Sequence, residues 1–377
     1  MNRLLFLSML VHAYVGLRLL PPLEPAATAL LALVLAVSAL LVPLAMGARR
    51  LAQPWADRLT WAGMLAMGFF SSLFVLTVLR DVLLLASHIA GVWWPAALPG
   101  ERLLERSALA VPVLAALATL AGLWNARRIA RARRVHVPIE SLPGELHGLR
   151  IVQLSDVHVG PTIKRRYVEA VVERANALQP DVIAITGDLV DGSVQELAEH
   201  VAPLAGLRAR HGVYFVTGNH EYYAGAHHWI AELRRLGIRV LLNEHVVLSH
   251  DAAELVLAGV TDFSAGHFDR SHASDPQAAL RGAPTDAVKV LLAHQPRSAP
   301  AAAQAGFHLQ ISGHTHGGQF LPWKWFVPLQ QPFTAGLHSL GAMRVYVSRG
   351  TGYWGPPKRL GAPSEITELV LVRPVSG

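Results

Sequence analysis

Hydrophobic residues are distributed very differently in the two parts of this chain of 377 residues. Residues 1–126 are dominated by Leu, Ala and Val, whereas from about residue 136 short apolar runs alternate with polar stretches. A helix needs about 20 mainly apolar residues to cross the hydrocarbon core of a membrane. Four stretches satisfy this requirement, and we expect membrane helices at residues 4–20, 26–46, 59–79 (with an alternative end at residue 90) and 107–124.

The first apolar stretch contains His12 and Arg18, and a signal peptide is its alternative interpretation. We favour a membrane helix, because no small-residue cleavage site precedes a soluble segment and further apolar stretches follow. The adjacent residues Arg80 and Asp81 interrupt the third stretch. They form either a transport pair or, as we favour, a helix end or a pair whose charges neutralise each other.

Basic residues predict the orientation of the membrane part. With four spans, Arg18, Arg102 and Arg106 fall on one side. A larger set falls on the other side: Arg3, Arg49, Arg50, Arg58, Arg127, Arg128, Arg131, Arg133 and Arg134. Because positive charge concentrates on the cytoplasmic side, we expect an integral protein of the inner or plasma membrane with everything after Arg134 in the cytoplasm. We divide the chain into a transmembrane region at 1–134, with a basic juxtamembrane end, and a second domain at 135–377.

The second part alternates between two periodicities. Apolar, β-branched runs predict strands at residues 149–154, 181–186, 212–217, 238–242, 246–248, 255–260, 288–293, 307–311 and 344–348. Helical periodicity predicts helices at residues 165–178, 194–207 and 226–236. Strands alternating with helices indicate the α/β class.

Asp, Asn and His side chains follow the ends of five of these strands, where sheet folds place their ligand sites. The clusters are Asp156 with His158, Asp188 with Asp191, Asn219 with His220 and Glu221, His294, and His314 with His316. Taken alone, the clusters at residues 156–158, 187–188 and 218–220 are better explained as a helix cap, a turn and a loop. The five together are poorly explained as turns and indicate a metal site, since residues i and i+2 of an extended backbone point the same way.

Composition limits the metal chemistry. The chain has no cysteine and 19 histidines, so a metal is held by nitrogen and oxygen ligands. These ligands favour Mn²⁺, Fe, Mg²⁺ or an N/O-ligated Zn²⁺. The net charge of +7 clusters beside the apolar stretches, so we expect anionic lipid headgroups rather than nucleic acid as the partner.

The five clusters, in this order, resemble the motifs of the calcineurin-like metallophosphoesterases over residues 148–372. The extended form Gly313-His314-Thr315-His316-Gly317-Gly318-Gln319, together with the apolar N-terminal stretches, is most similar to the membrane-anchored subgroup, the transmembrane proteins with a metallophosphoesterase domain. The resemblance implies a four-layer α/β/β/α sandwich, in which two mixed sheets are covered by helices. It also implies two divalent metal ions.

The resemblance also implies roles for individual residues. One ion is held by Asp156, His158, Asp188 and His316, and the other by Asp188, Asn219, His294 and His314. His220, oriented by Asp191, protonates the leaving oxygen or stabilises the transition state. Further candidates for supporting or substrate contacts are Glu221, His267 and Arg359.

These observations favour a phosphoesterase that hydrolyses a phosphodiester or pyrophosphate bond at the membrane surface. A phosphomonoesterase or phosphoprotein phosphatase is a second interpretation, and a non-enzymatic membrane metal sensor or transporter is a third. A weaker resemblance to bacterial phosphodiesterases of lipid A biosynthesis suggests a lipid-linked substrate such as UDP-2,3-diacylglucosamine.

The segment at residues 320–328 bears on the substrate. It contains Trp323, Lys324 and Trp325, and Pro322 and Pro328 break its periodicity, so we expect a loop. Either its aromatic rings lie at the headgroup level of the membrane, with Lys324 available to a phosphate, or they pack onto the protein core.

Overall fold

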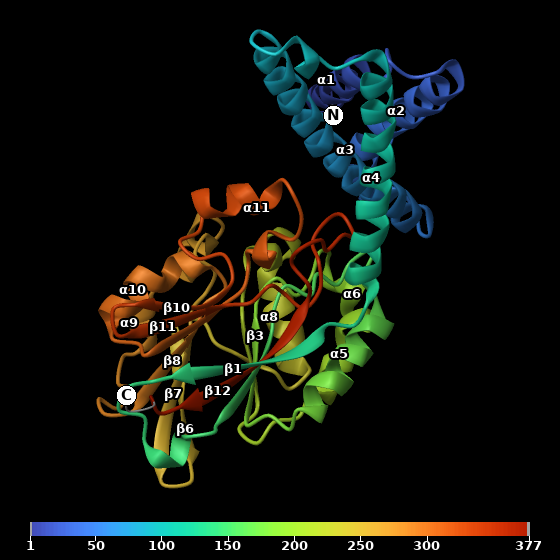
Figure 1. The fold of residues 1–377 in the computed structure, drawn as a ribbon. Coiled ribbons are helices and arrows are strands. Elements are labelled where there is room, and N and C mark those ends of the chain that lie inside the picture. The colour runs from blue at the N-terminus through green and yellow to red at the C-terminus, as the bar shows by residue number, and fades with distance from the viewer. Residues whose placement is uncertain (1, 375–377) are drawn as a thin grey trace. The chain divides into compact units, whose positions relative to one another are not determined.

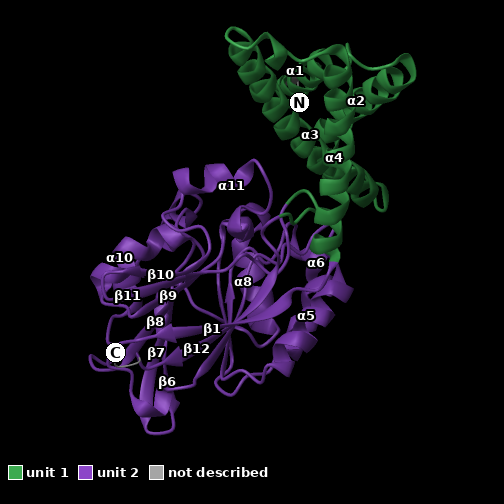
Figure 2. Ribbon diagram, in the orientation of Figure 1, with its two compact units in different colours: residues 1–127, 355–360 green, residues 128–354, 361–377 purple. Residues whose placement is uncertain are grey.

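A computed structural model of the chain describes residues 2–374, which form two compact units (Figure 2). Unit 1 consists of Met1–Arg127 and Gly355–Leu360, and unit 2 consists of Arg128–Trp354 and Gly361–Gly377. The division into domains at residues 1–134 and 135–377 stays a prediction.

Unit 1 is built from four helices: α1 (Asn2–Leu19), α2 (Pro25–Met46), α3 (Trp55–Gly91) and α4 (Glu101–Arg127). Their apolar side chains meet in one cluster that includes Val15, Leu35, Leu73 and Val111. The four predicted apolar stretches are therefore helices. Among the described residues, three segments are long and apolar enough to cross a membrane, Pro25–Met46, Trp55–Gly91 and Pro95–Arg127, and α1 is not one of them.

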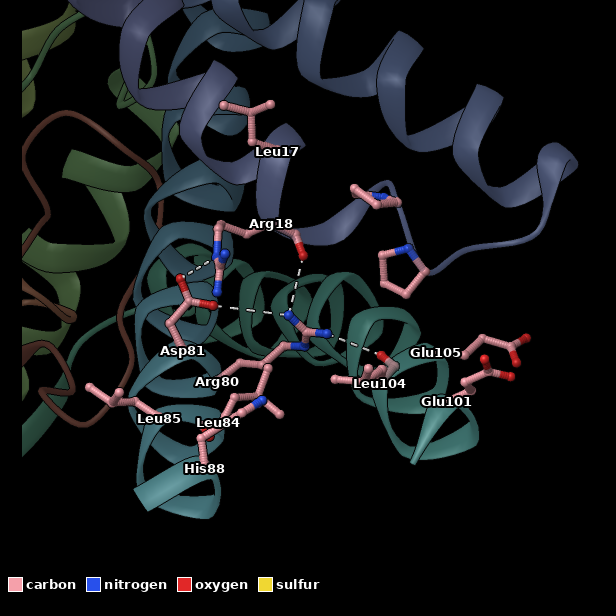
Figure 3. A pocket seen from close by; sticks show the side chains of 12 residues that line it. Leu17, Arg18, Arg80, Asp81, Leu84, Leu85, His88, Glu101, Leu104 and Glu105 are labelled. Atoms are coloured by element: carbon pink, nitrogen blue, oxygen red, sulfur yellow. Dashed lines mark hydrogen bonds and ion pairs between the residues drawn. The ribbon is translucent and has the colours of Figure 1, made fainter. Parts of the chain in front are cut away.

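The charged residues inside α3 are engaged by neighbouring helices (Figure 3). Arg18 Nε lies 2.8 Å from Asp81 Oδ2, and the Tyr14 hydroxyl donates to the same oxygen at 2.7 Å. Arg80 donates to Ser107 Oγ at 2.9 Å and to carbonyl oxygens of α1 and α4. Arg80 and Asp81 line a cavity of about 850 Å³, but their contacts favour charge neutralisation between helices over a transport pair.

The segment Gly355–Leu360 packs against α3 and α4 within unit 1. Lys358 Nζ donates to the carbonyl of Gly68 at 2.6 Å and to Thr119 Oγ1 at 3.2 Å. A Cβ atom at Gly122 would lie 2.5 Å from Lys358 Cγ, so the small residue in α4 makes room for the lysine stem. Two helices and a segment more than 200 residues away in the sequence are thereby held together.

Unit 2 contains two six-stranded mixed sheets (Figure 1). The first has the order β1-β12-β2-β3-β4-β5 and the second β10-β11-β9-β8-β7-β6. The strands of the first sheet are β1 (Arg131–Pro138), β2 (Arg150–Leu154), β3 (Val182–Thr186), β4 (Val213–Val216), β5 (Arg239–Val240) and β12 (Glu365–Val372). Those of the second are β6 (Glu244–His250), β7 (Ala253–Gly259), β8 (Val288–Leu292), β9 (Leu309–Ser312), β10 (Gly336–Leu340) and β11 (Met343–Val347).

The main core lies between the two sheets. It joins Ile151 and Ala184 of the first sheet to Leu257 and Ile311 of the second. Helices α5 (Arg165–Ala177), α6 (Val194–Val201) and α8 (Ala226–Arg235) flank the first sheet, and α9 (Pro276–Ala279) and α10 (Ala299–Ala305) flank the second (Figure 1). This is the four-layer α/β/β/α arrangement implied by the resemblance.

Strand β1 was not predicted, and one local prediction was wrong. The basic segment after α4 is strand β1, whose Arg133 and Arg134 form ion pairs with Glu365 and Glu368 of β12 at 3.2 and 2.7 Å. Part of the basic cluster therefore neutralises protein carboxylates rather than lipid headgroups. Residues Trp323–Phe326, expected in a loop, form the short helix α11, because the prolines lie outside the turn rather than within it.

Candidate metal centre

The five polar clusters meet where the two sheets present the carboxyl ends of parallel strands. Strands β2, β3 and β4 are parallel neighbours in the first sheet, and β8 and β9 are parallel neighbours in the second. The turns after these strands carry all seven side chains predicted as metal ligands: Asp156, His158, Asp188, Asn219, His294, His314 and His316. Alternation of strands and turns thus gathers residues that are up to 160 positions apart in the sequence.

Most of these residues have an unusual backbone conformation. Asp156, His158, Asp188, His314 and His316 have φ between 51° and 70°, the left-handed region that non-glycine residues seldom occupy. Such strain persists only where the surroundings enforce it, and it is concentrated at functional sites.

Glycines permit the close approach of these turns. A Cβ atom at Gly313 would lie 2.2 Å from Asp156 Oδ2, and one at Gly218 would lie 2.2 Å from Asp188 Oδ1. Any larger residue at either position would displace a proposed ligand. This requirement explains the glycines that precede Asn219 and His314.

The first group of donor atoms comprises Asp156, His158 and His316. His316 Nε2 lies 3.4 Å from Asp156 Oδ1 and 3.0 Å from His158 Nε2. Asp188 Oδ2 lies 3.9 Å from His158 Nε2 and completes the set. All four residues are buried, so the donor atoms converge on one interior point of unit 2.

The second group comprises Asp188, His294 and His314. His294 Nε2 lies 3.2 Å from Asp188 Oδ2 and 3.1 Å from His314 Nδ1. The side-chain oxygen of Asn219 is buried and has no hydrogen-bond partner among residues 2–374. Since a buried amide oxygen without a partner is costly, its presence here fits a metal ligand.

The electrostatics reflect this concentration of charge. Burial opposes ionisation of Asp188, but the His294 and His220 imidazoles outweigh it and hold the pKa of Asp188 well below its usual value. Burial alone lowers the pKa of His294, yet the Asp188 carboxylate raises that pKa well above 6.5. Burial, together with the charge of His294, lowers the pKa of His314 to about 3. The residues fit two divalent cations, which replace protons as partners of the carboxylates.

His220 lies beside both groups, at the start of α7 (Asn219–Ala224). Its Nδ1 atom is 2.7 Å from Asp191 Oδ1, and its Nε2 atom is 3.9 Å from Asp188 Oδ2. Burial lowers the pKa of His220, but the charges of Asp188 and Asp191 outweigh burial and raise it to about 9. Without metal, the imidazole is therefore protonated at neutral pH.

Glu221 stabilises the turns that carry the candidate ligands and does not itself belong to either donor group. It is fully buried, and its carboxylate accepts N–H groups of Gly218, Asp188 and Leu189 at 2.6, 3.0 and 2.8 Å. Burial and the nearby Asp188 charge raise the pKa of Glu221 to about 7. Of the two roles considered for Glu221, these contacts favour support over substrate contact.

The remaining candidates do not belong to either donor group. His267 is exposed, and its Nδ1 atom contacts the carbonyl of Ser264. Trp323 and Lys324 belong to α11, and a Cβ atom at Gly318 would lie 2.5 Å from Lys324 Cα, so α11 rests on the turn after His316. Arg359 belongs to unit 1, where its amide donates to the carbonyl of Gly122 at 2.9 Å.

Sequence reasoning missed two aromatic rings beside His220. The rings of Tyr223 and Trp354 lie 5.3 and 6.0 Å from the imidazole, centroid to centroid. Gln319 fixes Trp354 by accepting its backbone N–H and donating to its carbonyl, at 3.0 and 2.9 Å. The only sequence signal for Trp354 was its place after the glycine-rich run that follows β11.

Comparison with known proteins shows similarity to one family. Residues 149–318 match the family described as calcineurin-like phosphoesterase. Over 283 residues the chain is 44% identical to the transmembrane protein with metallophosphoesterase domain of Bos taurus, covering 72% of this chain and 63% of that protein. It is 34% identical over 266 residues to an uncharacterized metallophosphoesterase of Campylobacter jejuni, covering 70% of this chain and 69% of that protein.

The chain therefore belongs to the calcineurin-like metallophosphoesterase family, whose members use a centre of two divalent metal ions. Its relatives include membrane proteins. A solved putative 5′-nucleotidase from Staphylococcus aureus is similar with a TM-score of 0.38 and 13% identity over 60% of this chain and 55% of that one.

Proposed function

We propose that this chain is a membrane-tethered phosphoesterase that hydrolyses a phosphodiester or pyrophosphate bond with two divalent metal ions. The observation that carries the proposal is the position of Asp188. Its Oδ2 atom lies 3.2 Å from His294 Nε2 in one donor group and 3.9 Å from His158 Nε2 in the other. A single carboxylate shared by two groups is suited to bridging two ions.

We assign the donors to two sets. One ion is held by Asp156, His158, Asp188 and His316, and the other by Asp188, Asn219, His294 and His314. When bound, Mn²⁺, Fe, Zn²⁺ or Mg²⁺ would polarise phosphoryl oxygens and make water a stronger nucleophile at neutral pH.

His220 supplies the acid in this proposal. Asp191 engages its Nδ1 atom, which leaves Nε2 as the atom that donates a proton to the oxygen leaving phosphorus. Against the effect of burial, the hydrogen bond to Asp191 raises the pKa of His220 and favours the protonated imidazole that this role requires. A metal sensor or transporter has no use for such an acid, which is why we favour an enzyme.

We infer that unit 2 lies on the cytoplasmic side of a plasma or inner membrane. Arg127 ends the last long apolar helix, α4, and Arg128 and Arg131 follow it; clusters of basic residues stay on the cytoplasmic side. The ion pairs of Arg133 and Arg134 weaken this argument without reversing it.

A lipid-linked substrate is the second proposal, and exposed aromatic residues favour it. Trp323 and Trp325 of α11 are 49% and 61% exposed, directly after the turn that carries His314 and His316. Trp at a membrane surface satisfies both its apolar ring and its N–H group. Neither the structure nor the relatives point to UDP-2,3-diacylglucosamine or to lipid A biosynthesis in particular.

One assay separates the candidate functions. Purified full-length protein, loaded with Mn²⁺, is given a nitrophenyl phosphodiester, a nitrophenyl phosphomonoester and a nucleotide-diphosphate lipid side by side. We expect a higher kcat/KM for the diester or the pyrophosphate lipid than for the monoester. A preference for the monoester would support a phosphatase, and metal binding with no hydrolysis would support a sensor or transporter.

A further inference from the structure

A third group of metal-ligating side chains lies outside the two groups already described. His227, Asp269 and His272 each offer one ligand atom, and these atoms all lie within 4.8 Å of one another. His227 lies in the first turn of α8, and Asp269 and His272 lie in the segment that follows β7. Helix α8 and this segment thus bring together two imidazoles and one carboxylate, which are side chains that bind transition metals.

The distances resemble those of the main centre. His227 Nε2 lies 3.0 Å from Asp269 Oδ2, and the rings of His227 and His272 are 4.8 Å apart, centroid to centroid. In the main centre, His294 Nε2 lies 3.2 Å from Asp188 Oδ2. In both places, imidazole nitrogens and one carboxylate oxygen face a common point.

Two of the three side chains are held in a ligating orientation by other contacts. Asp269 Oδ1 accepts the N–H and hydroxyl of Ser271 at 2.9 and 2.6 Å, which directs Oδ2 toward His227. His272 Nδ1 lies 2.8 Å from the Tyr222 hydroxyl, which leaves Nε2 for the cluster. Metal-binding histidines commonly hydrogen-bond through their other ring nitrogen in this way.

We propose that His227, Asp269 and His272 bind a third divalent transition metal ion, of which Zn²⁺ is the best fit. Two imidazoles and one carboxylate are a frequent set for Zn²⁺, with water in the remaining position. His227 is exposed and Asp269 is half-buried, so solvent reaches the site. Mg²⁺ and Ca²⁺ are disfavoured because they prefer oxygen ligands.

This ion would stabilise the aromatic residues that lie beside His220. The Tyr222 hydroxyl joins His272 to α7, the helix that carries Asn219 and His220. Phe268, one residue before Asp269, packs against the rings of Tyr222 and Tyr223 at 5.7 and 5.6 Å. A metal bound to Asp269 and His272 would therefore hold Phe268 beside Tyr223, the ring that contacts His220.

Counting bound ions tests the proposal, and the count does not depend on the proposed enzymatic function. Full-length protein in detergent is stripped with a chelator and dialysed against Zn²⁺, and bound Zn²⁺ per chain is measured by mass spectrometry. The double variant His227→Ala/His272→Ala should bind one Zn²⁺ fewer than the unmodified chain. His228→Ala, which removes an exposed histidine adjacent to the cluster, should bind the same number.

The melting temperature provides a second readout. In chelator the double variant should melt like the unmodified chain, and Zn²⁺ should raise its melting temperature by less. If the double variant does not fold, Asp269→Asn, which keeps the side-chain volume, takes its place in both measurements. Equal Zn²⁺ counts in the variant and the unmodified chain would overturn the proposal, and the 3.0 Å contact would then be a surface hydrogen bond.

A variant of the main centre distinguishes this failure from failure of the proposed function. Asp188→Asn should lose Zn²⁺ from the main centre and retain the ion at His227, Asp269 and His272. Adding the His227→Ala/His272→Ala pair to Asp188→Asn should then remove that last ion. Retention of that ion in the combined variant would contradict the assignment, whatever the hydrolytic activity of the unmodified chain.

Discussion

Asp191 lies 2.7 Å from His220, measured between Oδ1 and the ring atom Nδ1. The same oxygen lies 2.9 Å from Nδ1 of His158. Burial opposes the charge of Asp191, but the two imidazoles outweigh burial and hold its pKa well below the usual range. One carboxylate that stays ionised thus orients both the proposed acid and a proposed metal ligand.

This arrangement predicts that His220 acts in the chemistry and not in metal binding. The variant His220→Ala should keep both ions and lose about 10²–10⁴ in kcat, the usual contribution of a positioned acid. Bound metal and kcat are measured on the same preparation, with His228→Ala as the control for an exposed histidine. Loss of metal together with activity would make His220 a ligand.

The raised pKa of His294 predicts that metal uptake releases protons. Without metal, the Asp188 charge overcomes the effect of burial and raises the pKa of His294, which favours its protonated form, whereas a ligating imidazole must be neutral. His314, with its pKa of about 3, has no proton to release. Affinity for metal should therefore rise with pH until His294 is neutral in the metal-free protein.

Calorimetry in buffers of different ionisation enthalpy measures this release. At pH 7 we expect proton release from the His294 side, and less release as the pH is raised. The variant Asp188→Asn, titrated in the same buffers, provides the control for protons exchanged elsewhere. Metal binding at pH 7 without proton release would show that His294 is already neutral.

Sequence patterns predicted the residues that the structure brings together in the two donor groups, because the signal of each is local. Each candidate ligand follows, within a few residues, a strand of mostly buried residues, so the motif and the strand that positions it are close in the sequence, as at Ile185 and Asp188. The helices of unit 1 were recognisable for a similar reason, since a run of about 20 apolar residues has few interpretations other than a membrane helix.

The features that were missed depend on contacts between distant residues. Strand β1 was interpreted as a basic juxtamembrane segment because Glu365, the partner of Arg133, lies 232 positions later. The group formed by His227, Asp269 and His272 was not predicted, because its members lie on different elements. His267 was the only residue of that segment predicted to have a functional role, and it is not part of the group. Local periodicity cannot predict contacts between residues that are distant in the sequence, because these contacts depend on the tertiary structure.

The exposed rings of α11 predict a difference between substrates. Replacing both Trp323 and Trp325 by Ser should raise KM for a lipid-linked substrate in mixed micelles and leave KM for a small soluble diester unchanged. Tyr14→Phe, a change of an aromatic residue in unit 1, serves as the matched control. Equal losses on both substrates with a lower melting temperature would mean that the rings stabilise the fold.

The arginines after α4 predict the orientation of the chain in the membrane. A reporter fused after Gly377 that is active only outside the cytoplasm should give no signal, and a cytoplasmic reporter at the same place should be active. Fusions after residue 52, on the same predicted side, should behave alike. An external signal at the C-terminus would reverse the orientation and exclude substrates confined to the cytoplasm.

The shared position of Asp188 is the central claim, and the variant Asp188→Asn tests it most directly. Full-length protein and variant are loaded with Mn²⁺ under the same conditions, and bound Mn²⁺ and hydrolysis of the preferred ester are measured together. Because the variant loses the carboxylate that we assign to both donor groups, it should lose most of its Mn²⁺ and its activity. Full Mn²⁺ content with full activity in Asp188→Asn would contradict the two-metal assignment.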